Sequence, residues 1–240
     1  MVITGASRGL GAACARAFAR SNSKTSVVLM GRTQADLEAV AADICNLGGI
    51  AHPVVCDVTD RRRVEEVLSS LDSLDVLVNN AGTNDPRPFL DVTEESFDRI
   101  VGLNLKALFF TTQIAARHMV ALGQPGVIVN VSSQMGFVGA SNRTVYCASK
   151  HGVEGLTKAI AVELAPKGIR CLTVAPTFFT SGMATGLSSP RISQELLAQI
   201  PLGRFATTDE VAETIVFAAS PQASLMTGTS LVLDGGWTAK

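Results

Sequence analysis

The 240-residue sequence has little net charge, few aromatic residues and no long uncharged apolar run. Twenty basic and 21 acidic residues leave a formal charge of -1, so no broad positive field is available for nucleic acid or an anionic membrane. No stretch of about 18 uncharged apolar residues could span a bilayer, and no basic segment followed by an apolar run opens the chain. These features predict a cytoplasmic protein that binds a small molecule and neither nucleic acid nor a membrane.

Cysteines are few and poorly placed for cross-links or metal. The five cysteines are odd in number and widely spaced, and none forms a Cys-x-x-Cys pair, so neither a disulfide framework nor a zinc site is expected. They are Cys14, Cys45, Cys56, Cys147 and Cys171. We therefore expect a reducing compartment and no bound metal.

Short apolar runs and glycines are what the sequence has in abundance. Hydrophobic residues make up 47% of the chain, which also contains 21 glycines, and this suits buried strands joined by tight turns. Stretches of helical periodicity separate the runs, which predicts βαβ units. We expect an α/β fold, in which one domain over residues 1–240 forms a doubly wound, mostly parallel, seven-stranded sheet with helices on both faces. The expected strands lie at Met1–Ile3, Val27–Met30, Ala51–Cys56, Val76–Val78, Val127–Val131, Cys171–Ala175 and Leu231–Leu233.

Two regions depart from this regular pattern. Met1–Ile3 is about half a normal strand length, so either the first strand is short or it begins upstream of the residues given. From Thr177 to Pro201, serine, glycine and proline interrupt the pattern. A mobile substrate loop at about 177–201, with one short helix at Ser193–Gln199, is our interpretation.

A glycine-rich turn, Thr4–Gly11, follows the first strand and precedes an alanine-rich helix expected from about Ala12 to Arg20. Glycines permit a tight turn and let backbone N–H groups approach a pyrophosphate at the positive end of a helix, as in Rossmann-type folds. An ordinary strand-to-helix turn is the alternative, since this motif alone does not establish nucleotide binding. The candidate cofactor contacts here are Gly5, Ser7, Arg8, Gly9 and Leu10.

The position that would select NAD carries no acid. A carboxylate about 20 residues after the turn would hold the ribose hydroxyls of NAD, but Gly31 stands there, followed by Arg32. Arg32 and Arg8 can both pair with a 2′-phosphate, so NADP(H) is preferred, with NAD(H) as the alternative. Either arginine could instead be a solvated surface charge.

Two further loops follow expected strand ends. Asp57 ends the third apolar run, and Asn79–Gly82 ends the fourth. Asp and Asn are common turn-formers, but at the carboxyl ends of parallel strands they line the crevice where such sheets bind ligands. The candidate cofactor contacts in these loops are Asp57, Val58, Asn80, Ala81 and Gly82.

A lysine lies on the apolar face of a predicted helix. Tyr146, Lys150 and Val153 recur at helical spacing in the stretch from Tyr146 to Leu164. An unpartnered buried ammonium is costly, so the lysine either snorkels outward or serves the tyrosine one turn before it. A nearby cation favours the phenolate and brings the tyrosine pKa down from about 10 toward the working range of a general acid or base.

Two more polar residues occupy suggestive positions. Ser133 ends the fifth apolar run, where its hydroxyl could hydrogen-bond a reacting oxygen or could belong to an ordinary turn. Asn104 interrupts an apolar stripe that runs from Phe97 to Thr112. A core amide satisfied by backbone groups and a functional asparagine are equally good interpretations.

Taken in order, these motifs resemble those of the classical short-chain dehydrogenases/reductases over essentially the whole chain. Thr-Gly-x-x-x-Gly-x-Gly is Thr4–Gly11, Asn-Asn-Ala-Gly is Asn79–Gly82, and Tyr-x-x-x-Lys is Tyr146–Lys150. The resemblance implies an oxidoreductase that interconverts a secondary alcohol and a ketone with NADP(H) or NAD(H). It also implies a catalytic tetrad of Asn104, Ser133, Tyr146 and Lys150.

The roles within this tetrad follow from the same resemblance. It implies that Tyr146 transfers the proton while Ser133 steadies the substrate oxygen. Lys150 lowers the tyrosine pKa and binds the nicotinamide ribose, and Asn104 holds a water of the proton relay. Asp57 is expected to meet the adenine.

The resemblance also implies contacts after the sixth strand, where the family usually has Pro-Gly and, a few residues later, a threonine for the carboxamide. Here the matching residues are Pro176, Thr177 and Ser181. The remaining expected cofactor contacts are Pro176, Phe179, Ser181, Tyr146 and Lys150. The expected substrate contacts are Ser133, Met135, Arg143, Tyr146, Phe178 and Met183, with Gln134 and Phe137 as further walls.

Two subgroups of the family have similar local sequences. Ile200–Phe205 and Asp234–Gly236 are similar to 3-oxoacyl-carrier-protein reductases, whereas Ala175–Thr177 and Gly236–Ala239 look more like sugar, sugar-acid or polyol dehydrogenases. The substrate is thus a 3-oxoacyl thioester or a keto-sugar, sugar acid or polyol. The family resemblance implies a homotetramer.

Two other functions compete with this one. A catalytically silent nucleotide-binding regulator or partner subunit would be expected to lose Ser133, Tyr146 or Lys150, and all three are present. An epimerase or dehydratase of the extended relatives is disfavoured, because those proteins use another glycine spacing and need a larger C-terminal region.

Overall fold

The computed structural model describes residues 1–22, 24–179 and 190–239. Seven strands form one sheet in the order β3-β2-β1-β4-β5-β6-β7, and every neighbouring pair is parallel. The strands are β1 (Val2–Thr4), β2 (Ser26–Gly31), β3 (Ile50–Val55), β4 (Val76–Asn79), β5 (Gly126–Val131), β6 (Ile169–Pro176) and β7 (Ser230–Leu233). This confirms the predicted doubly wound sheet. The strand order reverses between β1 and β4, where open α/β sheets bind ligands.

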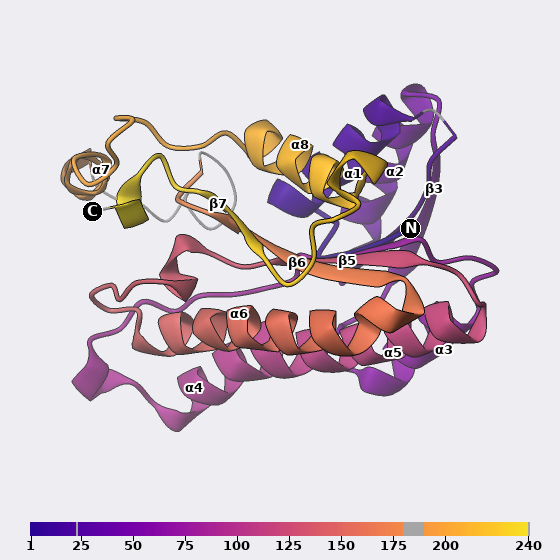
Figure 1. Ribbon diagram of the computed structural model, residues 1–240. Coiled ribbons are helices and arrows are strands. Elements are labelled where there is room, and N and C mark those ends of the chain that lie inside the picture. The colour runs from indigo at the N-terminus through magenta and orange to yellow at the C-terminus, as the bar shows by residue number, and fades with distance from the viewer. Residues whose placement is uncertain (23, 180–189, 240) are drawn as a thin grey trace.

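Helices cover both faces of the sheet (Figure 1). On one face lie α1 (Gly9–Ser21), α2 (Gln34–Asn46) and α8 (Thr208–Ala219). On the other lie α3 (Arg61–Ser69), α4 (Glu94–Val101), α5 (Leu108–Ala121) and α6 (Thr144–Leu164). The shorter α7 (Pro190–Leu197) lies near the carboxyl end of the chain. Within the described ranges, no helix is both long and apolar enough to cross a membrane.

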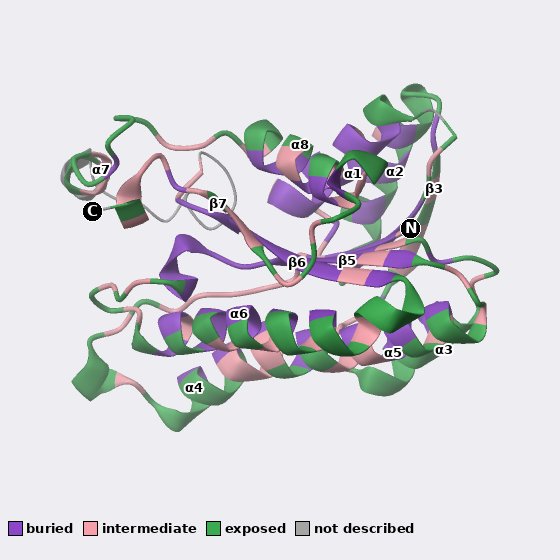
Figure 2. Cartoon of the chain, viewed as in Figure 1, coloured by how far each residue is buried: buried purple, intermediate pink, exposed green. Residues whose placement is uncertain are grey.

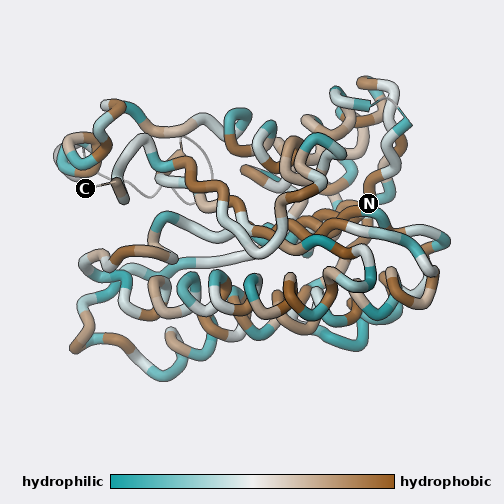
Figure 3. The backbone as a smooth tube through the Cα atoms, viewed as in Figure 1, coloured by the Kyte–Doolittle hydropathy of each residue, from teal (hydrophilic) through white to brown (hydrophobic). Residues whose placement is uncertain are grey.

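The strands are buried on both sides because their apolar runs are continuous. Successive side chains of a strand point to opposite faces. Ile3 and Leu29 therefore enter the apolar layer beneath α1, α2 and α8, whereas Val2 and Val28 enter the layer beneath α3, α5 and α6. The buried residues follow the sheet and the inner faces of the helices (Figure 2), and the most hydrophobic stretches of chain follow the central strands (Figure 3).

A π-helical segment, Gly102–Ala107, joins α4 to α5. A π-helix bonds i to i+5 and therefore takes more residues per turn than an α-helix. As a result, the expected apolar stripe is wrong at its start: Phe97 is 47% exposed, and Ile100 is buried in its place. The segment carries Asn104, which is buried as expected.

The segment after β6 differs in detail from the expectation. The expected helix at Ser193–Gln199 is α7, which begins earlier, at Pro190, and ends earlier, at Leu197. Proline suits the first helical turn, where its missing N–H has no partner to lose. Ser181 and Met183 lie outside the described residues, so of the expected loop at 177–201 only 177–179 and 190–201 are described.

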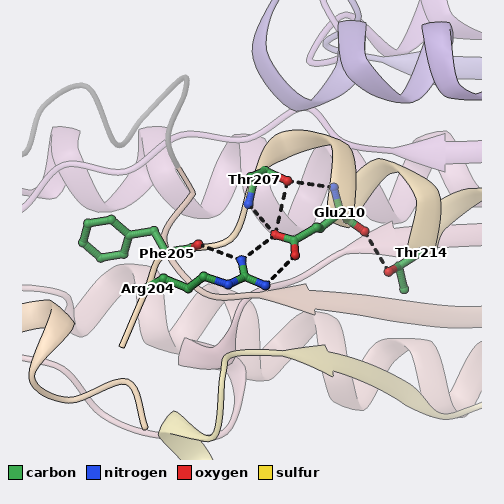
Figure 4. A network of polar contacts seen from close by, with 5 residues as sticks. All are labelled: Arg204, Phe205, Thr207, Glu210 and Thr214. Carbon is green, nitrogen blue, oxygen red and sulfur yellow. Dashed lines mark hydrogen bonds and ion pairs between the residues drawn. The ribbon is translucent and has the colours of Figure 1, made fainter. Parts of the chain in front are cut away.

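The return of the chain into α8 is fixed by a capping box (Figure 4). Thr207 Oγ1 accepts a hydrogen bond from Glu210 N at 3.1 Å, and Glu210 Oε2 accepts one from Thr207 N at 2.8 Å. The Arg204 guanidinium donates to both Glu210 carboxylate oxygens, at 2.6 and 2.9 Å. Ala206 N donates to Phe178 O at 3.1 Å, so this anchored turn lies beside the residues that follow β6.

Candidate active site

The expected site residues lie at the carboxyl ends of the strands, along one edge of the sheet. Because all seven strands are parallel, the loops that follow them meet at this edge. After β1 come Gly5, Ser7, Arg8, Gly9 and Leu10; after β2, Arg32; after β3, Asp57 and Val58; after β4, Asn80, Ala81 and Gly82; after β5, Ser133 and Met135; and at the end of β6, Pro176, Phe178 and Phe179.

The glycine-rich turn has a shape that only glycine provides. Gly5 and Gly9 have φ angles of 64° and 58°, in the left-handed region. A Cβ on Gly11 would lie 2.3 Å from Gly5 O, so the turn closes tightly on α1. That helix starts at Gly9, earlier than the expected Ala12. No side chain caps it and its first turn holds no acid, which leaves its N–H groups suited to a phosphate.

The loops after β1 and β4 are hydrogen-bonded to each other at the switch point. Thr4 Oγ1 accepts from Asn80 N at 3.0 Å and from Ala81 N at 3.1 Å. Asn80 Nδ2 donates in return to Thr4 O at 3.0 Å and Gly5 O at 3.1 Å. The two loops are therefore tied to each other where the strand order reverses.

The end of β2 carries no negative charge. Gly31 is buried, whereas Arg8 and Arg32 are exposed. In the described ranges, neither guanidinium has a hydrogen-bond or ion-pair partner. After β3, Asp57 Oδ1 accepts from Thr59 N at 2.9 Å and Thr59 Oγ1 at 2.8 Å. This local turn fixes the Asp57 carboxylate just beyond the end of β3.

Ser133 and Tyr146 meet beyond the end of β5. Ser133 is buried, and its Oγ accepts from Met135 N at 3.2 Å. Tyr146 lies in the first turn of α6 and is half-buried, and the Ser133 hydroxyl lies close enough to its phenol to lower the pKa. Burial raises the pKa of Tyr146, and the Ser133 hydrogen bond and the positive charge of Arg143 oppose that rise.

Lys150 is turned from the helix toward the sheet. It is 5% exposed, and its Nζ donates to Val131 O at 2.8 Å and lies 5.7 Å from the centroid of the Tyr146 ring. Burial lowers the pKa of Lys150 to about 8, against an opposing effect of Glu154. Ser133 and Arg143 lower the pKa of Tyr146, and the expected lowering by Lys150 stays a prediction.

Asn104 connects the loop after β4 to α6. Its Oδ1 accepts from Thr83 N at 2.8 Å, and its Nδ2 donates to Thr83 O at 2.9 Å and Ser149 Oγ at 3.2 Å. Ser149 Oγ in turn donates to Tyr146 O at 2.8 Å. The carboxamide is thus satisfied largely by backbone groups, and it also supports the turn that bears the tyrosine.

Known proteins resemble this chain over nearly its whole length. The family model described as enoyl-(acyl carrier protein) reductase matches residues 5–238. The chain is 39% identical to L-xylulose reductase from Bos taurus, over 99% of this chain and 96% of that protein. It is 38% identical to 3-oxoacyl-[acyl-carrier-protein] reductase from Thermotoga maritima, over 98% and 96%. The chain belongs to the short-chain dehydrogenase/reductase family.

A solved structure agrees with this assignment. A gluconate 5-dehydrogenase from Burkholderia cenocepacia, crystallised with NADP and tartrate, matches with a TM-score of 0.94 at 29% identity, covering 100% of this chain and 94% of that one. The family resemblance drawn from the motifs is therefore confirmed, and the protein is an oxidoreductase of this family.

Our sequence reasoning missed one buried acid in this short-chain dehydrogenase/reductase. Glu154 lies one turn after Lys150 on α6 and is 5% exposed. Its Oε2 accepts hydrogen bonds from Thr173 Oγ1, at 3.0 Å, and from Ser230 Oγ, while Oε1 has no partner among the described residues. The i, i+4 spacing from Lys150 was the available signal.

A second missed feature is a buried row of polar side chains across the sheet. Asn79 Nδ2 donates to Thr112 Oγ1 at 2.8 Å and to Asn130 Oδ1 at 2.9 Å. Asn130 Nδ2 donates to Thr157 Oγ1 at 2.9 Å. The row joins α5, β4, β5 and α6, and thereby fixes the depth at which α6 packs beneath the site. The signal in the sequence that could have indicated this row was an asparagine inside an apolar run.

The remaining expected wall residues of the enzyme form two groups. Gln134 and Met135 are buried, whereas Phe137 is 40% exposed. Past the end of β6, the Phe178 ring contacts those of Phe205 and Trp237, with centroids 6.2 and 6.0 Å away. Sequence reasoning had not placed either of these partners beside Phe178.

The end of β6 is fixed to β7. Thr177 N donates to Leu233 O at 2.9 Å, and Phe179 pairs with Ala206 in a parallel bridge. Thr177 Oγ1 is buried and has no partner in the part of the chain that the structure describes. A buried hydroxyl in this state suits a polar ligand group such as a carboxamide.

Proposed function

We propose that this enzyme transfers a hydride between NADP(H) and a secondary alcohol or ketone, with Tyr146 as the general acid and base. The observation that carries the proposal is the neighbouring pair of Ser133 and Tyr146, with Lys150 buried one turn later on α6. The Ser133 and Tyr146 hydroxyls lie beyond the carboxyl end of β5, and a doubly wound sheet binds its ligands at that edge.

Each residue has a distinct part in the proposed reaction. The Ser133 hydroxyl binds the substrate oxygen, and the Tyr146 hydroxyl donates a proton to it in reduction or accepts one in oxidation. Lys150 holds positive charge beneath the site. Asn104 holds a water of the proton relay, and the hydrogen bonds of its carboxamide to Thr83 and Ser149 fix it beside the turn that carries Tyr146.

The residues present fit a dinucleotide. When bound, NADP(H) supplies or accepts the hydride. The uncapped start of α1 and the Gly5 and Gly9 turns would hold the pyrophosphate. Arg8 and Arg32, whose guanidinium groups have no partner among the described residues, would hold a 2′-phosphate. Asp57, Val58, Asn80, Ala81 and Gly82 would contact the adenosine half, and Lys150, Pro176 and Phe179 the nicotinamide half. NAD(H) is the alternative cofactor.

The substrate belongs to the classes that the relatives name. L-xylulose reductase and gluconate 5-dehydrogenase support a keto-sugar, sugar acid or polyol, and the carrier-protein reductase supports a 3-oxoacyl thioester. The wall would be formed by Met135, Arg143 and Phe178, beside Ser133 and Tyr146.

The decisive experiment follows NADPH and NADH absorbance against a panel of these substrates, with Tyr146→Phe as the matched variant. We expect turnover to fall by at least about 10²-fold while cofactor affinity changes little. Ordinary turnover in Tyr146→Phe would exclude the tyrosine mechanism. Tight NADPH binding without turnover on any substrate would favour the silent regulator.

The same proposal includes a cytoplasmic homotetramer. Exposed apolar side chains on α5 and α6, Phe109 at 39% and Val162 at 77%, support an interface there. Gly155 and Ala159 are exposed on α6 and would permit close approach, whereas Gly152 faces Leu105 within the chain. Light scattering at micromolar concentration tests this, and a monomer would refute it.

A further inference from the structure

Arg143 differs from the other partly buried arginines in having no strong partner. Its guanidinium makes one hydrogen bond in the described part of the chain, a long one of 3.4 Å to Asn142 O. By contrast, Arg170 donates three bonds to backbone carbonyls, and Arg16 pairs with Asp43 at 2.8 Å. Arg143 is half-buried, so it has lost part of its hydration without a compensating charge.

The lone guanidinium belongs to the mouth of the candidate site. Arg143 is the N-cap residue of α6, directly before the turn that carries Tyr146. The two groups interact electrostatically, since the charge of Arg143 lowers the pKa of Tyr146. Arg143 also precedes Tyr146 by three residues, so the two side chains start from the same end of α6.

The nearby acid cannot neutralise Arg143. Arg87 N donates to Asn142 O at 3.1 Å, which places the loop after β4 beside this segment. Asp85 in that loop is taken by Arg87, at 2.9 Å, and Arg99, at 2.5 Å. Asp85 is therefore already paired with two arginines.

We propose that Arg143 binds the carboxylate of the substrate, and that the substrate is accordingly a sugar acid or a similar hydroxy or oxo acid. The inference rests on the proposed function, because it needs the reacting oxygen at Ser133 and Tyr146. A carboxylate matches the planar fork of a guanidinium with two parallel hydrogen bonds. Its negative charge also compensates for the hydration that Arg143 lost on burial.

A neutral ketose or a fatty acyl chain provides neither the two parallel hydrogen bonds nor the opposite charge. A hydroxymethyl group offers one weaker hydrogen bond, and an acyl chain would desolvate the guanidinium further without pairing it. Arg143 therefore discriminates between substrates that carry the same ketone, by the charge at the far end of the molecule.

The test compares 5-oxo-D-gluconate with L-sorbose, which has the same carbon skeleton and ketone but a hydroxymethyl group in place of the carboxylate. We expect the wild type to show at least about tenfold higher kcat/KM for the oxo acid with NADPH. Arg143→Gln should remove that preference by raising KM for the oxo acid, and Arg143→Lys should retain part of it. Arg117→Gln, an exposed arginine of α5, is the matched control and should leave the ratio unchanged.

If turnover on both compounds is too low to measure, ligand binding tests the proposal instead. Calorimetry on the NADP-loaded protein would compare D-gluconate with D-glucitol, and tartrate with threitol. Each of these comparisons asks whether the wild type prefers the acid and whether Arg143→Gln removes that preference. The proposal is overturned if no comparison, in turnover or in binding, gives that result. If neutral ketoses are then reduced and Tyr146→Phe abolishes that reduction, the proposed function stands without this assignment.

Discussion

The ammonium of Lys150 donates a hydrogen bond to the backbone carbonyl of Val131, at 2.8 Å. Val131 is the last residue of β5, and Ser133 follows it closely in the chain. This one contact therefore ties the turn of α6 that carries Lys150 to the strand that presents Ser133. An ammonium has three donors, so the bond leaves others for groups within the crevice.

The charge state of Lys150 should depend on Glu154. Burial lowers the pKa of Lys150 to about 8, and Glu154 raises it. Glu154→Gln removes the negative charge but keeps an oxygen for Thr173 and Ser230, so Lys150 should lose its proton at lower pH than in the wild type. As the pH rises, NADPH affinity and kcat/KM should therefore begin to decline at a lower pH in Glu154→Gln than in the wild type.

Titration of both quantities from about pH 6 to 10 measures the effect. Thr173→Val is the matched control, because it removes a hydrogen bond to the same carboxylate while leaving the charge in place. An alkaline limb that moves equally in both variants, or in neither, would show that the charge of Glu154 does not act on Lys150.

Cofactor preference should respond to a carboxylate at the end of β2. A Cβ on Gly31 would meet Leu37 Cδ2 at 3.1 Å and Ser7 Cβ at 3.4 Å, so a side chain fits after a small shift of Leu37. Gly31→Asp should repel a 2′-phosphate and pair with ribose hydroxyls, which reverses a wild-type preference for NADPH by about tenfold or more. Gly31→Ala adds the same Cβ without charge and should not reverse the order. Equal binding of the two cofactors by wild type and Gly31→Asp would contradict this.

Gly11 should tolerate no side chain. A Cβ there would lie 2.3 Å from Gly5 O and 2.6 Å from Asn80 Nδ2, so the turn must open. We expect Gly11→Ala to lower the free energy of unfolding by about 1–3 kcal/mol and to weaken NADPH binding. Urea denaturation and fluorescence titration measure the two effects.

Gly102→Ala is the control for this change, because no atom lies within 4 Å of its Cβ position. It should leave stability unchanged or raise it by up to about 1 kcal/mol through helix propensity. A Gly11→Ala protein as stable as Gly102→Ala, with full NADPH affinity, would rule out the tight closure of the turn.

The capping box of α8 should contribute measurably to stability. Thr207→Ala removes the side chain that accepts from Glu210 N, and it should cost about 1 kcal/mol. Thr214→Ala in the same helix removes only a bond to Glu210 O and should change stability much less. Equal losses in the two variants, measured by urea denaturation, would contradict a specific role for the cap.

The acid partner of the cap adds a pH dependence. Hydrogen bonds from Arg204 and from Thr207 N lower the pKa of Glu210 from 4.5 to about 2. A lowered pKa means that its stabilising contribution is present above about pH 4.5 and is lost as the pH falls toward 2. The difference in stability between wild type and Glu210→Gln should therefore disappear over that range. A constant difference would mean that the charge is not involved.

The sequence by itself determined the fold class, the strands and the motifs, because these depend on neighbouring residues. Val27–Met30 and Val127–Val131 are apolar runs of strand length, and a run of that kind is buried on both faces of a parallel sheet in any such fold. Parallel strands also bring their carboxyl ends together, so the loops holding Asn80 and Ser133 could be placed at one edge before the structure was known.

Only the tertiary structure decided which partner each polar side chain has. Lys150 bonds to Val131 O and Asn104 to Thr83, whereas Arg143 pairs with no acid among the residues that the structure describes. Phe97 became exposed because a π-helical turn shifted the register of its helix. These outcomes depend on groups far apart in the chain, whose distances are set by how α6, β5 and the loop after β4 pack together, and no local spacing encodes that packing.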